Sequence, residues 1–395
     1  MDMHDRDTDV SARAGRYIRQ ISGYRAFIPA PLPPVPPVNI DNELQGLLSR
    51  ADLALGRLDG SIQTLPHPDL FVFMYVRKEA VLSSQIEGTQ SSLQDVLAAE
   101  ARVLSPDRPK DVGEVVNYVE AMNYGIERLA SLPVSVRLIR EIHGKLLHGV
   151  RGSHLTPGEL RTSQNWIGPA GCTLNEANFV PPPPHEVSNK MGELEQFLHE
   201  KSDLPLLIKI GLAHAQFETI HPFLDGNGRV GRLLITFLLC EQDVLLKPVL
   251  YLSYYFKKNR QLYYEKLQAV RDHGLWEDWL AFFMKGVIEV SRQATETARR
   301  VLMLREDHRS IITENFGRAA VNAHRVLEHL YIHPIVSVAD VQELTGTTYP
   351  AANELVSRLR EHGILKEMTR QVRNRKFTYE SYVNLFHDGE PEPGL

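Results

Sequence analysis

The stretch His221-Pro-Phe-Leu-Asp-Gly-Asn-Gly-Arg-Val-Gly-Arg232 joins two apolar segments of this 395-residue chain. Before it, apolar residues recur at helical spacing over 206–220, which predicts a helix. The proline after the histidine disfavours a helical conformation there and pushes the chain into a turn. The two glycines around the asparagine let the backbone approach a ligand closely. Residues 229–239 are apolar nearly all round, which predicts a second, buried helix.

A glycine turn that leads into a helix N-terminus presents unpaired N–H groups and the positive end of the helix dipole, so it favours an anion. Arg229 and Arg232 lie three residues apart on one face of the first turn, where the dipole disfavours cations. A bound anion accounts for that placement. Asp225 is placed to hold Mg²⁺, which takes one or two carboxylates plus phosphate oxygens. His221 suits a general base because the ordinary histidine pKa is near neutral.

Each residue also has a structural explanation when it is taken alone. A histidine before proline is usually structural, a Gly-x-Gly is usually a turn, and paired arginines usually form a solvated face. These structural explanations do not account for the combination, because solvated arginines do not normally lie in the first turn of so apolar a helix. The sequence lacks the P-loop pattern. An EF-hand beginning at Asp225 would need glycine and glutamate where Val230 and Thr236 stand.

The stretch resembles the signature of the Fic family, HPFx[D/E]GNGRxxR, at every fixed position. Members of that family have an all-helical core, and most transfer AMP from ATP to a Ser, Thr or Tyr hydroxyl of a protein. The resemblance implies a mainly α fold in which His221 deprotonates the target hydroxyl and Asp225 holds Mg²⁺ against the α- and β-phosphates. It assigns ATP binding to the rest of the loop, with the arginines on the β- and γ-phosphates: Gly226, Asn227, Gly228, Arg229, Val230, Gly231 and Arg232.

A second motif of the same family, the inhibitory [S/T]xxxE[G/N], is matched by Ser83, Glu87 and Gly88. These residues end a helix that the apolar spacing predicts upstream of Gly88. On general grounds Glu87 is only a carboxylate near a helix C-terminus, which the dipole disfavours. The resemblance implies that Glu87 pairs with Arg232 and takes the place of the γ-phosphate. Because the motif precedes the core, the chain resembles the class with an N-terminal inhibitory helix.

Two further regions resemble the family less specifically. The runs 161–171 and 177–186 alternate turn residues with extended segments, which predicts a β-hairpin with a proline-rich exit. The family has a flap there that takes the target peptide as an added strand, and an ordinary surface hairpin is the alternative. Tyr263 and Tyr264 match paired tyrosines of which one lines the adenine. A core position is equally open for either tyrosine.

The composition excludes several classes. A net charge of −5 and a pI near 6.4 give no general attraction to nucleic acid or anionic membranes. Cys172 and Cys240 have no metal-ligand spacing and suit a reducing cytoplasm. The polar, acidic start MDMHDRDTDV is no signal peptide, and no apolar run is long enough to span a bilayer. We therefore expect a cytoplasmic protein without a membrane partner.

The length predicts two or three domains. We expect an N-terminal helical region with a proline-rich arm and the inhibitory helix over 1–110. A Fic core over 111–290 and a linker helix with a winged-helix domain over 291–395 complete the chain. The proline-rich run 28–38 is interpreted as a spacer along the body, with a partner motif as the alternative. A long helix is expected from about 276 to 312, with both of its tryptophans in the core.

The C-terminal part predicts three helices over 323–330, 337–346 and 348–363, and two strands over 364–368 and 375–379. That order is the winged-helix order. Basic residues gather on the third helix and around the turn between the strands: Arg358, Arg360, Lys366, Arg370, Arg373, Arg375 and Lys376. They support DNA binding. A module for protein interaction or dimerisation, with a solvated basic edge, is supported equally well.

The implied function is a protein adenylyltransferase that uses Mg²⁺ and ATP, modifies a hydroxyl of a target protein and of itself, and is restrained by Glu87. Relatives that transfer UMP, phosphocholine or phosphate, or that remove AMP, are alternatives. Arg232 favours AMP, because the phosphate-transferring relatives deviate in the second half of the loop. A DNA-binding regulator whose Fic core senses a nucleotide is a rival of another class. A homodimer is a further expectation, since family members often dimerise.

Overall fold

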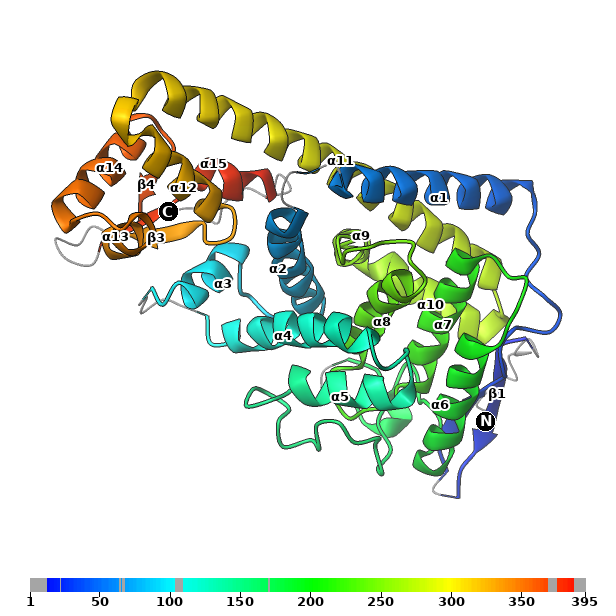
Figure 1. Ribbon diagram of the computed structural model, residues 1–395. Coiled ribbons are helices and arrows are strands. Elements are labelled where there is room, and N and C mark those ends of the chain that lie inside the picture. The colour runs from blue at the N-terminus through cyan, green and yellow to red at the C-terminus, as the bar shows by residue number, and fades with distance from the viewer. Residues whose placement is uncertain are drawn as a thin grey trace.

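The computed structural model describes residues 13–21, 23–63, 65, 68–103, 109–169, 171–368 and 375–386, apart from the side chain of Leu70. The fold in these ranges is mainly helical, as expected (Figure 1). The helices before the central loop are α1 (Asn42–Gln63), α2 (Pro68–Ile86), α3 (Leu93–Glu100), α4 (Val112–Leu129), α5 (Val136–Leu146), α6 (Pro184–His199) and α7 (Leu206–Ile220). After the loop come α8 (Asn227–Glu241), α9 (Ser253–Lys258), α10 (Arg260–His273) and α11 (Trp276–Asn315).

Helices α7 and α8 form the centre of the core. Both are buried almost all round, as the apolar runs on either side of the loop predicted. They lie against each other, and α4, α5, α6, α10 and α11 surround them (Figure 1). Trp279 of α11 donates its indole N–H to the carbonyl of Gly211 in α7 at 2.8 Å. The absence of a side chain at Gly211 allows that approach, because a Cβ there would lie 2.7 Å from Leu280.

Helix α11 extends from the core into the C-terminal part of the molecule. Its 40 residues begin at Trp276, and α1 packs along it (Figure 1). Both tryptophans expected in the core are buried there, at 1% and 0% exposure for Trp276 and Trp279. The predicted long helix is therefore confirmed, and it ends three residues later than expected.

The described residues before Asn42 form no helix. Strands β1 (Gly15–Arg19) and β2 (Arg25–Pro29) form an antiparallel hairpin that the sequence analysis missed. The proline-rich segment that follows has no regular secondary structure and runs along the body, as a spacer would. Arg13 donates to the carbonyls of Pro36 and Pro37 at 3.0 and 3.2 Å and pairs with Glu277 of α11 at 2.7 Å. These bonds hold the arm against the core.

The C-terminal part has helices α12 (Ala320–Leu330), α13 (Val338–Thr345) and α14 (Tyr349–Glu361), and the short α15 (Glu380–Val383). Strands β3 (Ile335–Ser337), β4 (Lys366–Glu367) and β5 (Lys376–Thr378) form a sheet in the order β3-β5-β4. Ser337 caps α13, and α13 ends at Gly346. Whether this unit belongs to the winged-helix class stays a prediction, and Arg370 and Arg373 lie outside the described residues. Short 3-10 turns occur at Leu174–Glu176, Gly317–Ala319 and Asn384–Phe386.

None of the helices in the described ranges combines the length and the apolarity that crossing a bilayer would require. Cys172 and Cys240 are free thiols. The cytoplasmic location stays a prediction.

Candidate active site

The loop between α7 and α8 is held in an unusual backbone conformation. His221, the first residue after α7, has φ 50° and ψ 61°, in the left-handed region that non-glycine residues rarely occupy. Its N–H still donates to the carbonyl of Phe217 at 2.9 Å, which closes the last turn of α7. Gly226 has φ 76° and opens α8. The turn predicted from the proline and glycines is therefore present, and it ends at the N-terminus of a buried helix.

Arg161 fixes the first half of this loop from the flap region. Its Nε donates to the carbonyl of His221 at 2.9 Å, and its backbone N–H donates to the carbonyl of Pro222 at 2.9 Å. Asn165 adds a bond from Nδ2 to the carbonyl of Phe223 at 2.8 Å. Burial lowers the pKa of Arg161 to about 10, because the charged guanidinium is largely removed from water.

His143 of α5 fixes the second half of the loop. Its ring stacks on that of Phe223, with centroids 3.7 Å apart. Nε2 bonds the carbonyl of Asp225 at 3.0 Å, while Nδ1 accepts the N–H of Gly158 at 2.8 Å. Burial lowers the pKa of His143 to about 4, so the ring is neutral at neutral pH and Nε2 carries the donated proton.

Asn227 has a different place from the one expected for a phosphate ligand. Its side chain is buried and turned back on the loop. Oδ1 accepts the N–H of Phe223 at 2.8 Å, and Nδ2 donates to the carbonyl of Phe223 at 2.8 Å. The amide therefore supports the shape of the loop, and a contact between Asn227 and a phosphate stays a prediction.

Arg229 is fully buried and incompletely paired. Nη1 donates to Oε2 of Glu114 in α4 at 3.1 Å, and Nη2 lies 3.6 Å from Oδ1 of Asp225. Within the described residues, Nε and Nη2 have no hydrogen-bond partner. Buried guanidinium N–H groups are normally bonded. Two unsatisfied donors beside a helix N-terminus therefore suit an anionic ligand such as a phosphate.

Arg232 is bonded to the end of α2 through two of its nitrogens. Nε donates to the hydroxyl of Ser83 at 2.8 Å, and Nη2 donates to the carbonyl of Ser83 at 3.0 Å and to Oε1 of Glu87 at 2.8 Å. The ion pair expected between Glu87 and Arg232 is thus present. Burial alone would raise the pKa of Glu87, but the Arg232 guanidinium holds that pKa below its usual value. Gly88, with φ 98°, follows the end of α2.

The carboxylate of Glu87 also covers the start of α8. A Cβ added to Gly228 would collide with Oε1 of Glu87 and would lie 2.9 Å from Nη1 of Arg232. A negative group therefore already occupies the place beside the backbone of the first turn. This is where the helix dipole and the unpaired N–H groups favour an anion.

The imidazole of His221 faces this loop and is half-buried. In the part of the chain that the structure describes, its Nδ1 has no hydrogen-bond partner. Burial lowers the pKa of His221 to about 3, and the positive charges of Arg271 and Arg161 act in the same direction. The ring is therefore neutral near pH 7 and can accept a proton. A polyanion bound beside it would raise this pKa.

Glu218 is a buried carboxyl that the sequence analysis missed. It lies on α7, three residues before His221, and packs so closely on α8 that a Cβ at Gly231 would collide with its Oε1. That oxygen has no hydrogen-bond partner among the described residues. Burial raises the pKa of Glu218 to about 7, which Arg232 and Arg271 partly oppose. The absence of a side chain at Gly231 allows this packing of α7 on α8, and a contact between Gly231 and a phosphate stays a prediction.

Of the remaining residues predicted to bind ATP, two are buried in the core and one lies at the surface. Val230 is buried in the core at 1% exposure. Tyr263 is buried too, and its hydroxyl donates to Nε2 of His214 at 2.9 Å. Tyr264 is 41% exposed, and Glu87 and Arg232 are close enough to affect its pKa, which burial raises. Of the two tyrosines, Tyr264 is thus the one placed to contact a nucleotide.

The flap region is more irregular than the hairpin expected. Among the residues described there, a single antiparallel bridge joins Ile167 to Phe179, with N–H···O distances of 2.8 and 3.0 Å. The N–H of Phe27 in β2 then donates to the carbonyl of Val180 at 2.9 Å. The N-terminal hairpin therefore lies directly beside the flap region, close to the loop that contains His221.

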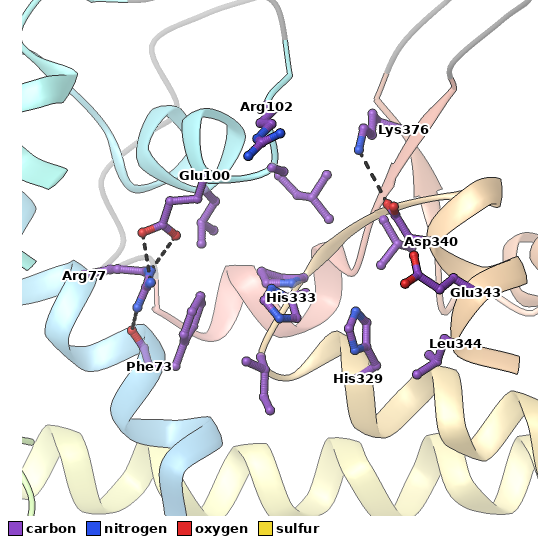
Figure 2. A pocket seen from close by; sticks show the side chains of 16 residues that line it. Phe73, Arg77, Glu100, Arg102, His329, His333, Asp340, Glu343, Leu344 and Lys376 are labelled. Carbon is purple, nitrogen blue, oxygen red and sulfur yellow. Dashed lines mark hydrogen bonds and ion pairs between the residues drawn. The ribbon is translucent and has the colours of Figure 1, made fainter. Parts of the chain in front are cut away.

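Helix α2 borders a second cavity on the side of the C-terminal part. Figure 2 shows this cavity of about 670 Å³, with Phe73 and Arg77 of α2 on one wall and His329, His333 and Asp340 on the other. Its charges are largely paired: Arg77 with Glu100 at 2.7 Å and Lys376 with Asp340 at 3.5 Å. None of the predicted site residues lies in it, so it is separate from the loop.

Three of the missed residues come from segments far away in the sequence, whereas Glu218 lies on α7, three residues before His221. Glu114, Glu218, His143 and Arg161 all touch the loop or its arginines through contacts that no local motif encodes. One signal was available, because Glu114 shares the stripe of Tyr118, Ala121 and Gly125 on an apolar helix face. A carboxylate on such a stripe needs a buried partner.

Comparison with known proteins decides the family. Residues 45–127 match the model of the Fic/DOC family N-terminal region, and residues 133–239 match that of the Fic/DOC family. The chain carries a Fic domain. All the predicted loop residues from His221 to Arg232 lie in that match.

Two relatives of this chain are named as protein adenylyltransferases. A probable protein adenylyltransferase of Aquifex aeolicus is 42% identical over 69 residues, which are 18% of this chain and 22% of that protein. The protein adenylyltransferase Fic of Aedes aegypti is 29% identical over 191 residues, 47% of this chain and 33% of that protein. The chain therefore spans a third or less of the length of these relatives.

A solved structure supports the fold over a wider range. The crystal structure of a Fic family protein from Desulfovibrio desulfuricans G20 matches with a TM-score of 0.58, covering 87% of this chain and 97% of that chain. The sequence identity is 20%, so this likeness shows the fold alone.

Proposed function

We propose that this chain is a protein adenylyltransferase whose loop binds ATP and whose α2 helix restrains it. The observation that carries the proposal is the carboxylate of Glu87 over Gly228, bonded to Arg232 at 2.8 Å. A negative group lies where the loop favours an anion, and it comes from the chain itself. The named relatives support AMP transfer as the reaction.

In this proposal the hydroxyl oxygen of the target attacks the α-phosphorus of ATP in line with the departing pyrophosphate. A bond forms between that oxygen and phosphorus, and the bond from phosphorus to the bridging oxygen breaks. The neutral imidazole of His221 takes the hydroxyl proton. Arg229 and the N–H groups at the start of α8 stabilise the charge on the phosphate oxygens.

Asp225 is the residue that would hold Mg²⁺. Its side chain is 32% exposed, and Oδ1 accepts the N–H of Gly226 at 2.6 Å. Across the described ranges, no three His, Cys, Asp or Glu side chains gather as a ready metal site. One accessible carboxylate suits Mg²⁺, which completes its coordination with phosphate oxygens and water. The bound ion would neutralise phosphate charge.

The restraint follows from competition for Arg232. While Glu87 holds this guanidinium, the γ-phosphate of ATP cannot use it, and the α-phosphate is not aligned with His221. Glu87 stands at the end of a helix and is 31% exposed, so the pair can separate without unfolding the core. Tyr264 would then lie beside the adenine.

The test is mass spectrometry of the purified Glu87→Gly protein after incubation with Mg²⁺ and ATP. We expect the mass to increase by one or more AMP groups, with little increase for the wild type. Glu87→Gln is the matched variant, because it keeps the size of the side chain and a weaker bond to Arg232, and we expect an intermediate result. Labelled ATP separates the alternatives: transfer of the γ-label, or no transfer by Glu87→Gly, would contradict the proposal.

For the C-terminal part, we infer a protein-interaction module and place DNA binding second. The described basic residues of its third helix and wing are engaged within the protein. Arg360 pairs with Glu367 at 3.3 Å, Lys366 with Glu380 at 2.6 Å and Lys376 with Asp340 at 3.5 Å. Arg358 donates to the carbonyl of Asn315 at 2.8 Å. Salt-dependent binding of duplex DNA by the full chain would reverse this order.

A further inference from the structure

The hairpin β1–β2 carries a concentration of positive charge that the proposed reaction does not use. Arg16, Arg19 and Arg25 are all exposed on it, in a chain whose net charge is −5. In the described ranges no carboxylate pairs with any of them, and Arg25 only lies over the ring of Tyr17, 5.4 Å from its centroid. This patch differs from most other arginines of the structure, which are tied to acids or carbonyls.

Arg19 and Arg25 are direct cross-strand partners. The register pairs Arg19 with Arg25 and Tyr17 with Phe27, so these four side chains share one face of the hairpin. Like charges directly opposite each other destabilise a strand pair. An acidic ligand bound between them would remove that cost. Arginine also suits carboxylates, because its planar guanidinium can bond both oxygens at once.

The same face leads to the flap. The ring of Phe27 lies 5.1 Å from that of Tyr17 and 5.9 Å from that of Phe179, which is paired to Ile167 in the flap. At the turn, the hydroxyl of Tyr24 donates to Oε1 of Gln164 at 3.1 Å. The hairpin that carries the arginine pair is thus attached to the flap at its middle and at its turn.

From the flap region, side chains also reach the backbone of His221, as the bond from Arg161 to its carbonyl at 2.9 Å shows. Asn165, next to Gln164, donates to the carbonyl of His221 at 3.3 Å. On the other side, Tyr17 donates to Asp272 at 3.3 Å, and the neighbouring Arg271 lies over the ring of Phe179 at 4.0 Å. A polypeptide that presents a hydroxyl to His221 would therefore pass close to the hairpin.

We propose that the Arg19–Arg25 pair binds acidic side chains of the target protein, so that the chain modifies hydroxyl residues that stand near aspartate or glutamate in the target. This inference rests on the proposed function and adds to it the substrate class. The hairpin is bonded to the flap rather than to the loop itself. The pair should therefore set the affinity for the target and leave the chemical step unchanged.

The first test compares peptides as substrates of the Glu87→Gly protein. Each peptide contains one Tyr, Ser or Thr, flanked by acidic, neutral or basic residues. At low salt we expect kcat/KM for acidic peptides to exceed that for neutral ones by about tenfold, the size expected for two exposed charge contacts. The difference should reside in KM and shrink at high salt. Equal kcat/KM for acidic and neutral peptides would overturn the proposal.

The second test changes the pair itself. Arg19→Gln with Arg25→Gln should remove the acidic preference and leave kcat unchanged. The matched control is Arg50→Gln with Arg57→Gln, which removes the same charge from exposed positions of α1. Arg19→Glu with Arg25→Glu should reverse the preference towards basic peptides. An acidic preference that survives in both hairpin variants would assign it to another surface.

Binding of a fluorescent glutamate-rich peptide, measured by anisotropy, separates this proposal from the proposed reaction. If Glu87→Gly transfers no AMP, the reaction is wrong, but acidic peptide should still bind the wild type more tightly than the double glutamine variant. If AMP is transferred and the two proteins bind that peptide equally, only the substrate class is wrong. Binding of an oligonucleotide that is stronger than binding of the peptide, and that depends on Arg19 and Arg25, would likewise overturn the proposed substrate class.

Discussion

The two arginines of the loop, Arg229 and Arg232, lie three residues apart on α8 and have different surroundings. Arg232 donates three hydrogen bonds to Ser83 and Glu87 of α2. Arg229 donates one, to Glu114 of α4, and two of its nitrogens have no hydrogen-bond partner in the described residues. Helix α2 therefore holds one arginine of the proposed anion site, while the other arginine keeps unsatisfied donors.

The acids that hold the two arginines differ in the same way. The side chain of Glu87 is 31% exposed and stands at the end of a helix, whereas that of Glu114 is 6% exposed and lies inside one. A partly exposed pair costs little to break, but removing one partner of a buried pair leaves an uncompensated charge. The Glu87–Arg232 pair should therefore separate readily, whereas the Glu114–Arg229 pair should persist.

The largest effect on the rate of AMP transfer should come from His221, which both arginines would supply with an aligned phosphate. In the Glu87→Gly background, His221→Ala should lower the rate of AMP transfer by roughly 10²- to 10⁴-fold, because the hydroxyl loses its base. ATP binding, measured by calorimetry, should stay within about twofold, since the arginines remain (about 0.4 kcal/mol). A variant that still transfers the α-label at the parent rate would remove His221 from the reaction.

The next largest effect should be the difference in unfolding free energy between the alanine variants of Arg229 and Arg232. Arg229→Ala should lower the free energy of unfolding by about 3 kcal/mol, because Glu114 is left buried without its main partner. Arg232→Ala should cost less, about 1–2 kcal/mol, since water can reach Glu87. Urea denaturation of both variants measures the comparison. The matched Glu114→Gln in the Arg229→Ala background should recover part of the loss, and equal costs for both arginines would contradict the distinction.

The pH dependence of stability should report Glu218, which lies beside the Arg232 side. Its pKa is raised from 4.5 to about 7 in the folded protein, so between these values the folded state binds more protons and stability falls as pH rises. Relative to Glu218→Gln, the wild type should lose about 2 kcal/mol between about pH 5.5 and 7.5.

The glutamine variant is the internal control for this measurement, because Glu79, also raised to about 7 by burial, is present in both proteins. The histidines with lowered pKa values oppose the trend below pH 6.5 equally in both. Parallel stability profiles for the two proteins would mean that Glu218 is ionised in the fold.

The smallest effect concerns the tyrosines. Tyr264→Ala should raise KM for ATP about fivefold, the lower range for loss of one base–aromatic stacking contact. Tyr263→Phe, which removes only the hydroxyl bonded to His214, should leave KM unchanged and lower stability by about 1 kcal/mol. The opposite pattern in steady-state kinetics and denaturation would exchange the roles of the two residues.

The sequence allowed prediction where the determinants are contiguous. Helix α7 ends where Pro222 requires, the turn follows at Gly226, and Ser83 and Glu87 reach Arg232 as the matched motif implied. The long helix α11 was also recognised from its apolar spacing. In each case the information lies within a few turns of helix, where spacing and turn chemistry decide the conformation.

Prediction was not possible where contacting residues are far apart in the sequence. Nothing near Arg229 indicates Glu114, which is 115 residues away. The bonds from the Asn227 amide to Phe223 are likewise not indicated by the motif. The hairpin β1–β2 was missed because its strands are stabilised by Phe179 and Val180 of the flap, and the flap in turn keeps only one bridge. Such contacts depend on tertiary packing.

Helix α11 has a practical consequence for anyone who wishes to divide this chain. The boundary expected near residue 291 falls inside it, and Ser291 is wholly buried. A helix of 40 residues is about 60 Å long, and this one belongs to both the core and the C-terminal part. A cut there would expose the surface that α1 covers and leave both fragments with an open apolar side. Fragments for crystallography or interaction screens should therefore retain this helix whole.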